Sequence, residues 1–284
     1  MNTMNLSKSN LLKCLYTILI PVVSGIVGLI LLAIAFLLPS SMIKDNVAKS
    51  LPIFQQETDY FSVTSGISGS QLDNYTDAIY LNEAMVSRKD ASIIECILSG
   101  YQFIASEEEG TPVANLERVI NNPENVSIRP ITERFFNGYE VVVKPLLCIT
   151  DYAGIRQINI FIVLSLSATL FILMAKKGLS RFIVPFVLAI AFINPLTVSL
   201  SMTFVGFYYC MIIPSVIILA MKPETLARKG WLVFGFIGAC TFYFNMNYFQ
   251  LLSFGVPLVF YLFVNGFPEK TRSAFRLFLS LFIP

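Results

Sequence analysis

An uninterrupted apolar run near the start of the chain constrains the fold most strongly. Residues Leu15–Leu38 are 24 consecutive uncharged positions, and at about 1.5 Å per residue such a helix crosses a hydrocarbon core of about 30 Å. A cleaved signal peptide has a shorter apolar region of about 7 to 15 residues, so we expect a retained signal anchor. The whole chain is 13% charged and 55% hydrophobic, which is a membrane composition.

Five further apolar segments extend the predicted membrane region. We expect spans at 157–175, 182–201, 203–221, 231–244 and 251–264. The last two have 14 residues each and would borrow from the six residues between them. The prediction is therefore an all-α membrane protein with about six transmembrane helices.

The connecting segments predict the orientation, because cytoplasmic loops are rich in Lys and Arg. Basic residues follow the second, fourth and sixth spans, namely Lys176, Lys177 and Arg181, then Lys222, Arg228 and Lys229, then Lys270, Arg272 and Arg276. The turns near Met202 and at Asn245–Gln250 carry no charge. We therefore predict a multi-pass protein of the cell membrane, with its N-terminus in the cytoplasm and the loop after the first span outside.

Charge also divides the chain into three parts. The segment 39–156 holds 16 of the 18 acidic residues but only 9 of the 20 basic ones, so its net charge is −7 while the remainder carries +9. We predict a cytoplasmic N-terminus and signal anchor (1–38), an acidic extracytoplasmic loop domain (39–156) and a transmembrane helical bundle (157–284). A partial seventh apolar stretch begins near Ala274 and indicates truncation at the C-terminus; a genuine end with a re-entrant or interfacial tail is the alternative.

The loop domain is expected to be mainly helical. After a Ser- and Gly-rich turn, apolar residues recur at the spacing of an amphipathic helix, namely Leu72, Tyr75, Ile79 and Val86. A second helix is expected over 92–104. A third is expected through Asn121, with Thr111 as its N-cap and Pro112 at its first position. The run 141–149 is predicted to approach the second span as an interfacial element.

Several kinds of chemistry are absent. The chain has no His, which excludes a Ser-His-Asp triad and the common zinc sites, and it has no phosphate-binding Gly-Lys-Ser/Thr loop. The predicted spans hold almost no ionisable residue, which argues against an ion-coupled transporter. Cys96 and Cys148 are the two cysteines of the loop domain, and they either pair in an oxidising compartment or stay free. No cofactor is expected; a divalent cation is compatible with the acidic loop but nothing indicates one.

Candidate catalytic groups are the acidic residues of the loop domain. Asp73 and Asp77 are four positions apart and so lie on one helical face, and an exposed, solvated surface is an adequate explanation of this pair. Asp59 follows the anchor by about 20 residues and lies among apolar and aromatic residues. It is the better candidate for a buried functional carboxylate.

Three basic residues are expected near the same outer surface. Arg134, Lys144 and Arg156 could bind a lipid phosphate or a diphosphate leaving group, since Arg contacts phosphate oxygens in a bidentate manner. The alternative is a role in orientation, through local ion pairs with Glu133 or Glu140.

The order of these pieces is similar to that of a known class of enzymes. The strings Leu-Asp-Asn-Tyr-Thr-Asp-Ala, Arg-Phe-Phe-Asn-Gly-Tyr-Glu-Val-Val-Val-Lys-Pro-Leu-Leu and Ile-Arg-Gln-Ile-Asn follow an anchor and a large outer loop. In this the chain resembles a group of polytopic proteins of Gram-positive bacteria whose layout is similar to the GT-C class of membrane glycosyltransferases. Those enzymes use a polyprenyl-phosphate sugar and place an acidic catalytic residue in the first outer loop. The resemblance covers most of Gln71–Leu262.

The resemblance also implies site residues. The positions that match its pattern are Asp73, Asp77, Arg134, Tyr139, Lys144, Pro145, Arg156, Gly255 and Pro257. Among these we take Arg134, Tyr139, Lys144 and Arg156 as candidate substrate-binding residues. The chain departs from the pattern at Asn245, where an Asp is expected on the outer turn. Together with the missing C-terminal helices, this departure suggests a diverged or inactive fragment.

Two functions follow as hypotheses. The first is an enzyme that transfers a sugar, with inversion, from a polyprenyl-phosphate donor to a cell-envelope acceptor, with Asp59 as general base and Arg134 or Arg156 on the phosphate. The second is a non-enzymatic membrane scaffold whose loop binds another protein during envelope assembly. The expected partners are the lipid bilayer and, from the resemblance, a polyprenyl-phosphate sugar; no nucleic acid is expected.

Overall fold

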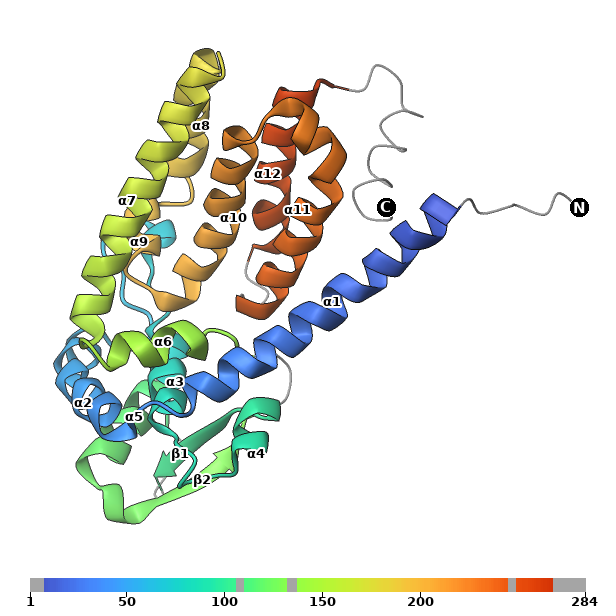
Figure 1. The fold of residues 1–284 in the computed structure, drawn as a ribbon. Helices are drawn as coiled ribbons and strands as arrows, with labels where there is room; N and C mark the ends of the chain where they lie inside the picture. The colour runs from blue at the N-terminus through green and yellow to red at the C-terminus, as the bar shows by residue number, and fades with distance from the viewer. Residues whose placement is uncertain (1–7, 106–109, 132–136, 245–248, 268–284) are drawn as a thin grey trace, which may run out of the picture.

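The computed structural model describes residues 8–105, 110–131, 137–244 and 249–267, with side chains from residue 19 onward (Figure 1). The described chain is nearly all helical. Its helices are α1 (Lys8–Ala35), α2 (Ser40–Glu57), α3 (Asn74–Met85), α4 (Ile93–Leu98), α5 (Pro112–Asn121), α6 (Glu140–Leu147), α7 (Tyr152–Lys176), α8 (Ile183–Ala191), α9 (Pro195–Val198), α10 (Met202–Ala220), α11 (Pro223–Phe244) and α12 (Gln250–Asn265). Three short 3-10 turns lie at Ser68–Ser70, Pro123–Asn125 and Ser180–Phe182. The strands β1 (Tyr101–Ala105) and β2 (Val126–Pro130) form one antiparallel pair, with Phe103 opposite Ile128.

The loop domain is built around α3. This helix contacts α2, α5, α6 and β1, and ten of its twelve residues are buried. The helix was expected here from the sequence, but the expected amphipathic character is wrong, because a helix surrounded by other elements has no solvated face. The third predicted helix is confirmed as α5, with the Thr111 side chain accepting from the Ala114 N–H and Pro112 in the first turn.

The predicted helix over 92–104 is wrong in its second half. A capping box between Ser92 and Glu95 begins α4, which ends at Leu98, and β1 follows it. The Asn82 side chain donates to the Phe103 carbonyl at 2.9 Å and accepts from the Phe103 N–H at 2.8 Å. This pair of bonds from α3 holds the strand extended, and no short-range pattern in the sequence reveals it.

The apolar helices form a second layer, above the loop domain in Figure 1. α7 and α10 are long and apolar enough to cross a membrane, and α1 with α2 forms a third candidate span that bends by 83° at the break between them. Within the described residues the structure thus offers two or three such helices, and the predicted count of six is not reproduced. The predicted partial seventh stretch lies outside the described residues.

The difference has identifiable physical causes. The predicted span over 182–201 is broken into α8 and α9, because Asn194 adopts φ 53° and Pro195 begins a new helix. α12 has only 16 residues, and α11 begins in a charged segment that includes Arg228 and Lys229. α12 is therefore too short to be a single span, and α11 is too polar at its start.

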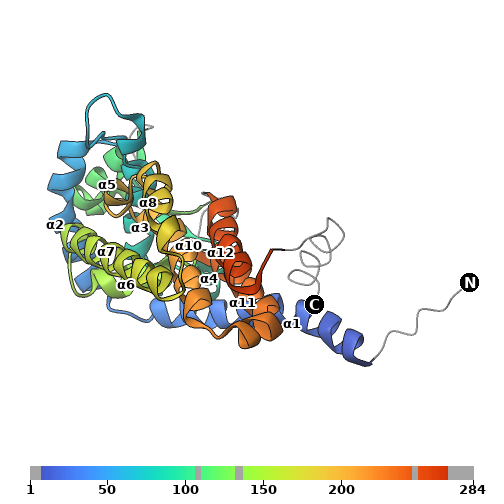
Figure 2. The same cartoon turned by 90° about the horizontal axis from the view of Figure 1, so that it is seen from above.

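The two layers have separate hydrophobic cores that meet where α7 and α10 begin. One core joins the loop domain to the end of α1 and includes Tyr152 and Met202; the other lies among α7, α10, α11 and α12. α10 packs on both α7 and α12, and α11 packs on α1 (Figure 2). The junction between the layers is where the candidate site residues gather.

Candidate functional site

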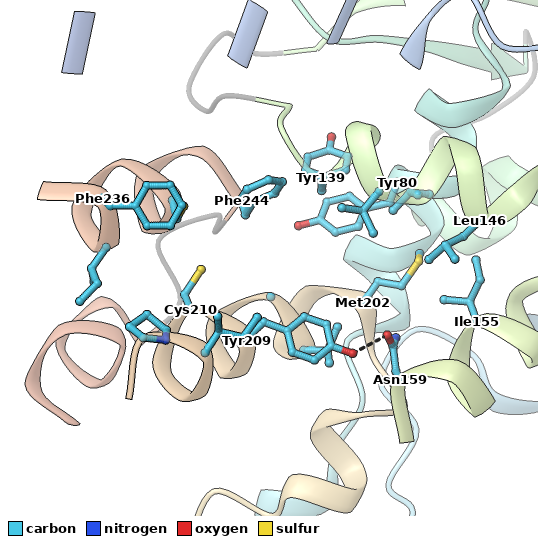
Figure 3. Close-up of a pocket in the computed structure, with 18 residues that line it drawn as sticks. Tyr80, Tyr139, Leu146, Ile155, Asn159, Met202, Tyr209, Cys210, Phe236 and Phe244 are labelled. Atoms are coloured by element: carbon cyan, nitrogen blue, oxygen red, sulfur yellow. Dashed lines mark hydrogen bonds between the residues drawn. The ribbon is translucent and has the colours of Figure 1, made fainter. Parts of the chain in front are cut away.

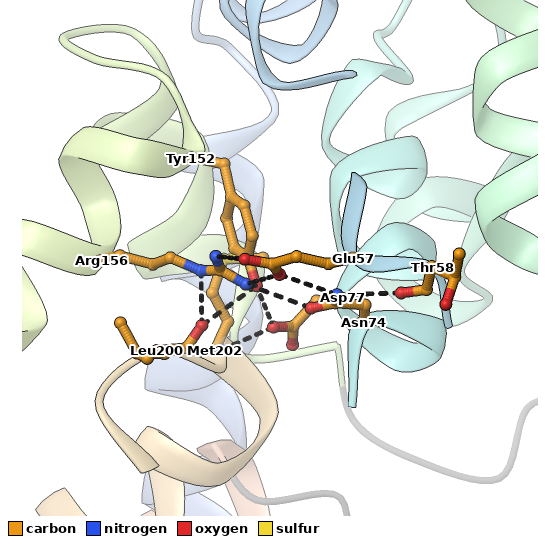
Figure 4. Close-up of polar contacts among 8 residues, drawn as sticks. All are labelled: Glu57, Thr58, Asn74, Asp77, Tyr152, Arg156, Leu200 and Met202. Carbon is orange, nitrogen blue, oxygen red and sulfur yellow. Dashed lines mark hydrogen bonds and ion pairs between the residues drawn. The ribbon is translucent and has the colours of Figure 1, made fainter. Parts of the chain in front are cut away.

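Five polar side chains meet at this junction, and we call them the junction cluster (Figure 4). Glu57 ends α2, Asn74 and Asp77 lie in the first turns of α3, and Tyr152 and Arg156 lie in the first turns of α7. Two backbone groups next to the start of α10 complete the cluster, namely the Leu200 carbonyl and the Met202 N–H. Segments about 100 residues apart in the chain are therefore joined by polar contacts in a largely buried place.

Arg156 is the centre of the cluster. Its two terminal nitrogens donate to the two carboxylate oxygens of Glu57, each at 2.7 Å, and its Nε donates to the Leu200 carbonyl at 2.7 Å. A further bond reaches the Asn74 side-chain oxygen at 3.2 Å, and the guanidinium lies over the Tyr152 ring. Arg156 therefore forms an ion pair, but its partner is Glu57 and not the predicted Glu140, and Glu133 lies outside the described residues. All of these contacts occupy the planar donor fork that a phosphate would otherwise use.

Asp77 connects α3 to the start of α10. One carboxylate oxygen accepts from the Met202 N–H at 2.9 Å and from the Tyr152 hydroxyl. The other accepts from the Thr203 N–H at 2.9 Å and the Thr203 hydroxyl at 2.7 Å. Burial raises the pKa of Asp77, and the bonds from Tyr152 and Thr203 oppose that rise. With two donors on each oxygen, the carboxylate acts as a remote N-cap of α10.

The expected solvated pair of Asp73 and Asp77 is wrong, because both side chains are buried. Asp73 is the N-cap of α3 and accepts from the Thr76 N–H. These contacts give both acids structural roles in which they stabilise helix N-termini.

Asp59 stays a prediction. It follows α2 by two residues and is partly exposed, and among the described residues its Oδ1 atom is buried without a hydrogen-bond partner. Of the three predicted catalytic acids it alone combines partial exposure with such an oxygen. Glu57 lies two residues before Asp59, and no pattern in the sequence indicates its pairing with Arg156.

Lys144 and Tyr139 lie in a second buried group, beside Glu83 and Glu140. We call these two glutamates the acid pair. Lys144 donates to the carbonyls of Ala84 at 2.7 Å and Val86 at 2.8 Å, so it caps the end of α3. Tyr139 donates to Glu83 and stacks on Tyr80. The Lys144 ammonium is therefore buried and bonded to backbone carbonyls, and it does not face an exposed site where a phosphate could bind.

The acid pair is electrostatically unusual. Burial, then the neighbouring Glu140, raises the pKa of Glu83 well above its ordinary range. Burial raises the pKa of Glu140 to about 8, against the opposing effect of Lys144. Burial lowers the pKa of Lys144, and Glu140 opposes that fall. Within the described part of the chain, neither Glu140 oxygen has a hydrogen-bond partner, so protonation relieves the cost of burying them.

An apolar cavity of about 340 Å³ is lined in part by Tyr139, the residue that donates to Glu83 (Figure 3). It opens between α6, α7, α10 and α11, and its lining includes Tyr80, Tyr139, Leu146, Ile155, Met202, Phe236 and Phe244. Its few polar groups include Asn159, which accepts from the Tyr209 hydroxyl at 2.9 Å. Such a lining suits a hydrocarbon chain better than a sugar or an ion.

Two predicted positions cannot be located, and the two cysteines of the loop domain are not paired. Arg134 lies outside the described residues, as does Asn245. Cys96 and Cys148 are free thiols, the first buried and the second partly exposed. The described residues contain no group of three or more His, Cys, Asp or Glu arranged to hold a metal ion.

Comparison of the chain with protein-family models, with curated proteins and with solved structures finds no match in any of the three.

Proposed function

We propose that this chain is a multi-pass protein of the cell membrane that transfers a sugar from a polyprenyl-phosphate donor to a cell-envelope acceptor. The observation that carries the proposal is the apolar cavity at the junction between the loop domain and the apolar helices. A hydrocarbon chain anchored there would hold its headgroup near the junction, where polar side chains replace apolar ones. The resemblance to GT-C enzymes supplies the donor class.

The proposed topology has six spans. In addition to α1, α7 and α10, it uses the broken unit of α8 and α9 and the shorter helices α11 and α12, while α2 belongs to the loop domain. Broken helices are tolerated at membrane depth where neighbouring helices satisfy the freed backbone groups. The basic segments after α7, α10 and α12 then lie in the cytoplasm, and the acidic domain lies outside.

Asp59 is the proposed general base. Its carboxylate removes the proton from the acceptor hydroxyl while that oxygen forms a bond to the anomeric carbon of the sugar. The bond from the anomeric carbon to the phosphate oxygen breaks, its electron pair leaves with the lipid phosphate, and the configuration inverts. Arg134 is the proposed phosphate partner, because Arg156 is already paired with Glu57 in the junction cluster. In this proposal Arg156 positions α7 against α2.

Membranes that contain the full-length protein provide the test. They are supplied with a polyprenyl-phosphate hexose labelled in the sugar, and transfer to the cell-envelope fraction is counted. Asp59→Asn is expected to lose transfer, whereas Asp45→Asn, an exposed acid on α2, retains it.

The two possible failures are distinct. Full transfer by the Asp59→Asn variant would refute Asp59 as the base and leave the enzyme class standing. No transfer by the unaltered protein, with reproducible crosslinking of the loop domain to one envelope protein, would favour the scaffold over the enzyme.

A further inference from the structure

Residues 60–72, between α2 and α3, form a compact hairpin that lies outside the junction cluster and the lining of the cavity. We call it the outer hairpin. Val63 N–H donates to the Ser70 carbonyl at 3.0 Å and Leu72 N–H donates to the Phe61 carbonyl at 2.8 Å, so its two arms are paired. Figures 1 and 2 place it beside α8 and α9, outside the helical bundle. It stands alongside the apolar layer although it belongs to the loop domain by sequence.

The hairpin presents apolar side chains to its surroundings. Tyr60, Phe61, Val63 and Ile67 are among the exposed large hydrophobic residues, and Ile67 at the tip is 54% exposed. No charged residue occurs between Asp59 and Asp73, although the domain as a whole is acidic. Thr64, Ser65 and Ser68 beside them are exposed and polar but carry no charge, so the apolar side chains form a patch on an uncharged tip.

Internal hydrogen bonds satisfy part of the backbone of the hairpin. The Ser70 hydroxyl accepts from the Thr64 N–H at 3.0 Å, and its one proton lies within donating distance of the Ile67 carbonyl at 2.7 Å and the Thr64 carbonyl at 2.9 Å. The Ile67 and Gln71 N–H groups donate to the Thr64 and Ser68 carbonyls within the hairpin. Backbone groups that enter lipid must be satisfied internally, and this network lowers the cost of entering it.

One contact connects the hairpin to the turn between α8 and α9. The Asn194 side chain, between α8 and α9, donates to the Gly69 carbonyl at 3.5 Å. Asn194 lies between Phe192 and Leu196, which are 90% and 59% exposed. Exposed apolar residues on a helix of this layer are expected to face acyl chains. The tip of the hairpin therefore lies next to an exposed apolar surface.

We propose that the outer hairpin inserts its tip into the outer leaflet of the bilayer, with Phe61, Val63 and Ile67 in contact with lipid. Its occupant is lipid rather than a protein, because the patch is uncharged and is continuous with α8 and α9. Tyr60, stacked on Tyr75 with ring centroids 5.8 Å apart, lies at the base, where aromatic rings suit the headgroup layer. The proposal rests on insertion of α7 and α10 in the membrane and is independent of the transfer reaction.

Tryptophan fluorescence tests the insertion, because Trp231 is the one Trp of the chain. In a Trp231→Phe background, Ile67→Trp and Val63→Trp place a reporter on the hairpin, and Ser127→Trp places a control on β2, at the far end of the loop domain (Figure 1). The full chain is reconstituted in vesicles of phosphatidylcholine, with or without bromine atoms on the acyl chains. Aqueous acrylamide is the second quencher.

The hairpin reporters are expected to lose about half or more of their emission in brominated vesicles and to resist acrylamide, since an interfacial segment is buried about 5–10 Å into the headgroup and acyl boundary. The Ser127→Trp reporter should show the opposite pattern. Acrylamide quenching of both hairpin reporters equal to that of the control would overturn the proposal. Protection from both quenchers would overturn it as well, because protein would then cover the tip.

Discussion

Replacing Asp77 by Asn tests the assignment of this carboxylate as the group that ties α3 to the start of α10. The two side chains have the same shape, so the change removes charge and acceptor capacity without creating a cavity. Each oxygen of Asp77 accepts from two donors, and an Asn side chain must turn its NH₂ group toward one of these pairs in either orientation.

The expected cost follows from that geometry. Two hydrogen bonds to a charged group are lost, at about 1.5–3 kcal/mol each. The hydroxyl of Tyr152 or Thr203 can rotate toward another acceptor, which reduces the loss. We therefore expect Asp77→Asn to lower the free energy of unfolding by about 3–5 kcal/mol. Asp73→Asn is the matched control, because Asn caps a helix about as well as Asp, and it should cost less than about 1 kcal/mol.

The assay is reversible unfolding of the purified full chain in mixed micelles with increasing dodecyl sulfate, followed by far-ultraviolet circular dichroism. The Asp77→Asn midpoint should fall well below that of the Asp73→Asn control. Equal midpoints for the two variants would show that the contacts of Asp77 with α10 contribute nothing particular, and the reasoning would fail.

Three further predictions concern the buried charges and thiols. Arg156→Met leaves Glu57 unpaired and should cost about 3–5 kcal/mol in the same assay, and adding Glu57→Gln should recover part of the loss; a fully additive double variant would contradict the pairing. Between pH 4.5, the ordinary pKa of a Glu, and about 8, the folded state binds more protons at Glu140 than the unfolded state. The free energy of unfolding should therefore fall as the pH rises through this range, and Glu140→Gln should flatten the slope; an unchanged slope would refute the raised pKa. In single-cysteine variants, Cys148 should react with a maleimide in the folded protein, and Cys96 should react only after unfolding.

The broad architecture was predictable because its signals are local. Charge and hydropathy along the chain give the division into an acidic domain and apolar helices, and Thr111 with Pro112 marks the start of α5. The strand β1 was missed because the contacts that hold it extended come from Asn82 on α3. A pattern read over a few residues contains no information about a partner about 20 positions away.

The sequence predicted some residues of the site but not the contacts that define their roles. Arg156 and Asp77 were singled out, but their partners Glu57 and Tyr152 come from segments separated by 75 residues or more in the sequence. Asp73 and Asp77 are buried although the sequence suggested a solvated face, because the elements that cover α3 come from distant parts of the chain. The cavity had no sequence signal at all, since apolar lining residues are indistinguishable from ordinary core residues.

Native mass spectrometry of the purified protein with a polyprenyl phosphate tests the central claim most directly, because it measures whether the apolar cavity holds a lipid chain. Cys210→Phe places bulk inside the cavity, and Ile217→Phe places the same side chain on α10 away from its lining. The unaltered protein and the Ile217→Phe control should bind one lipid, and Cys210→Phe should lose that binding. Equal binding by all three would contradict the cavity as the lipid site.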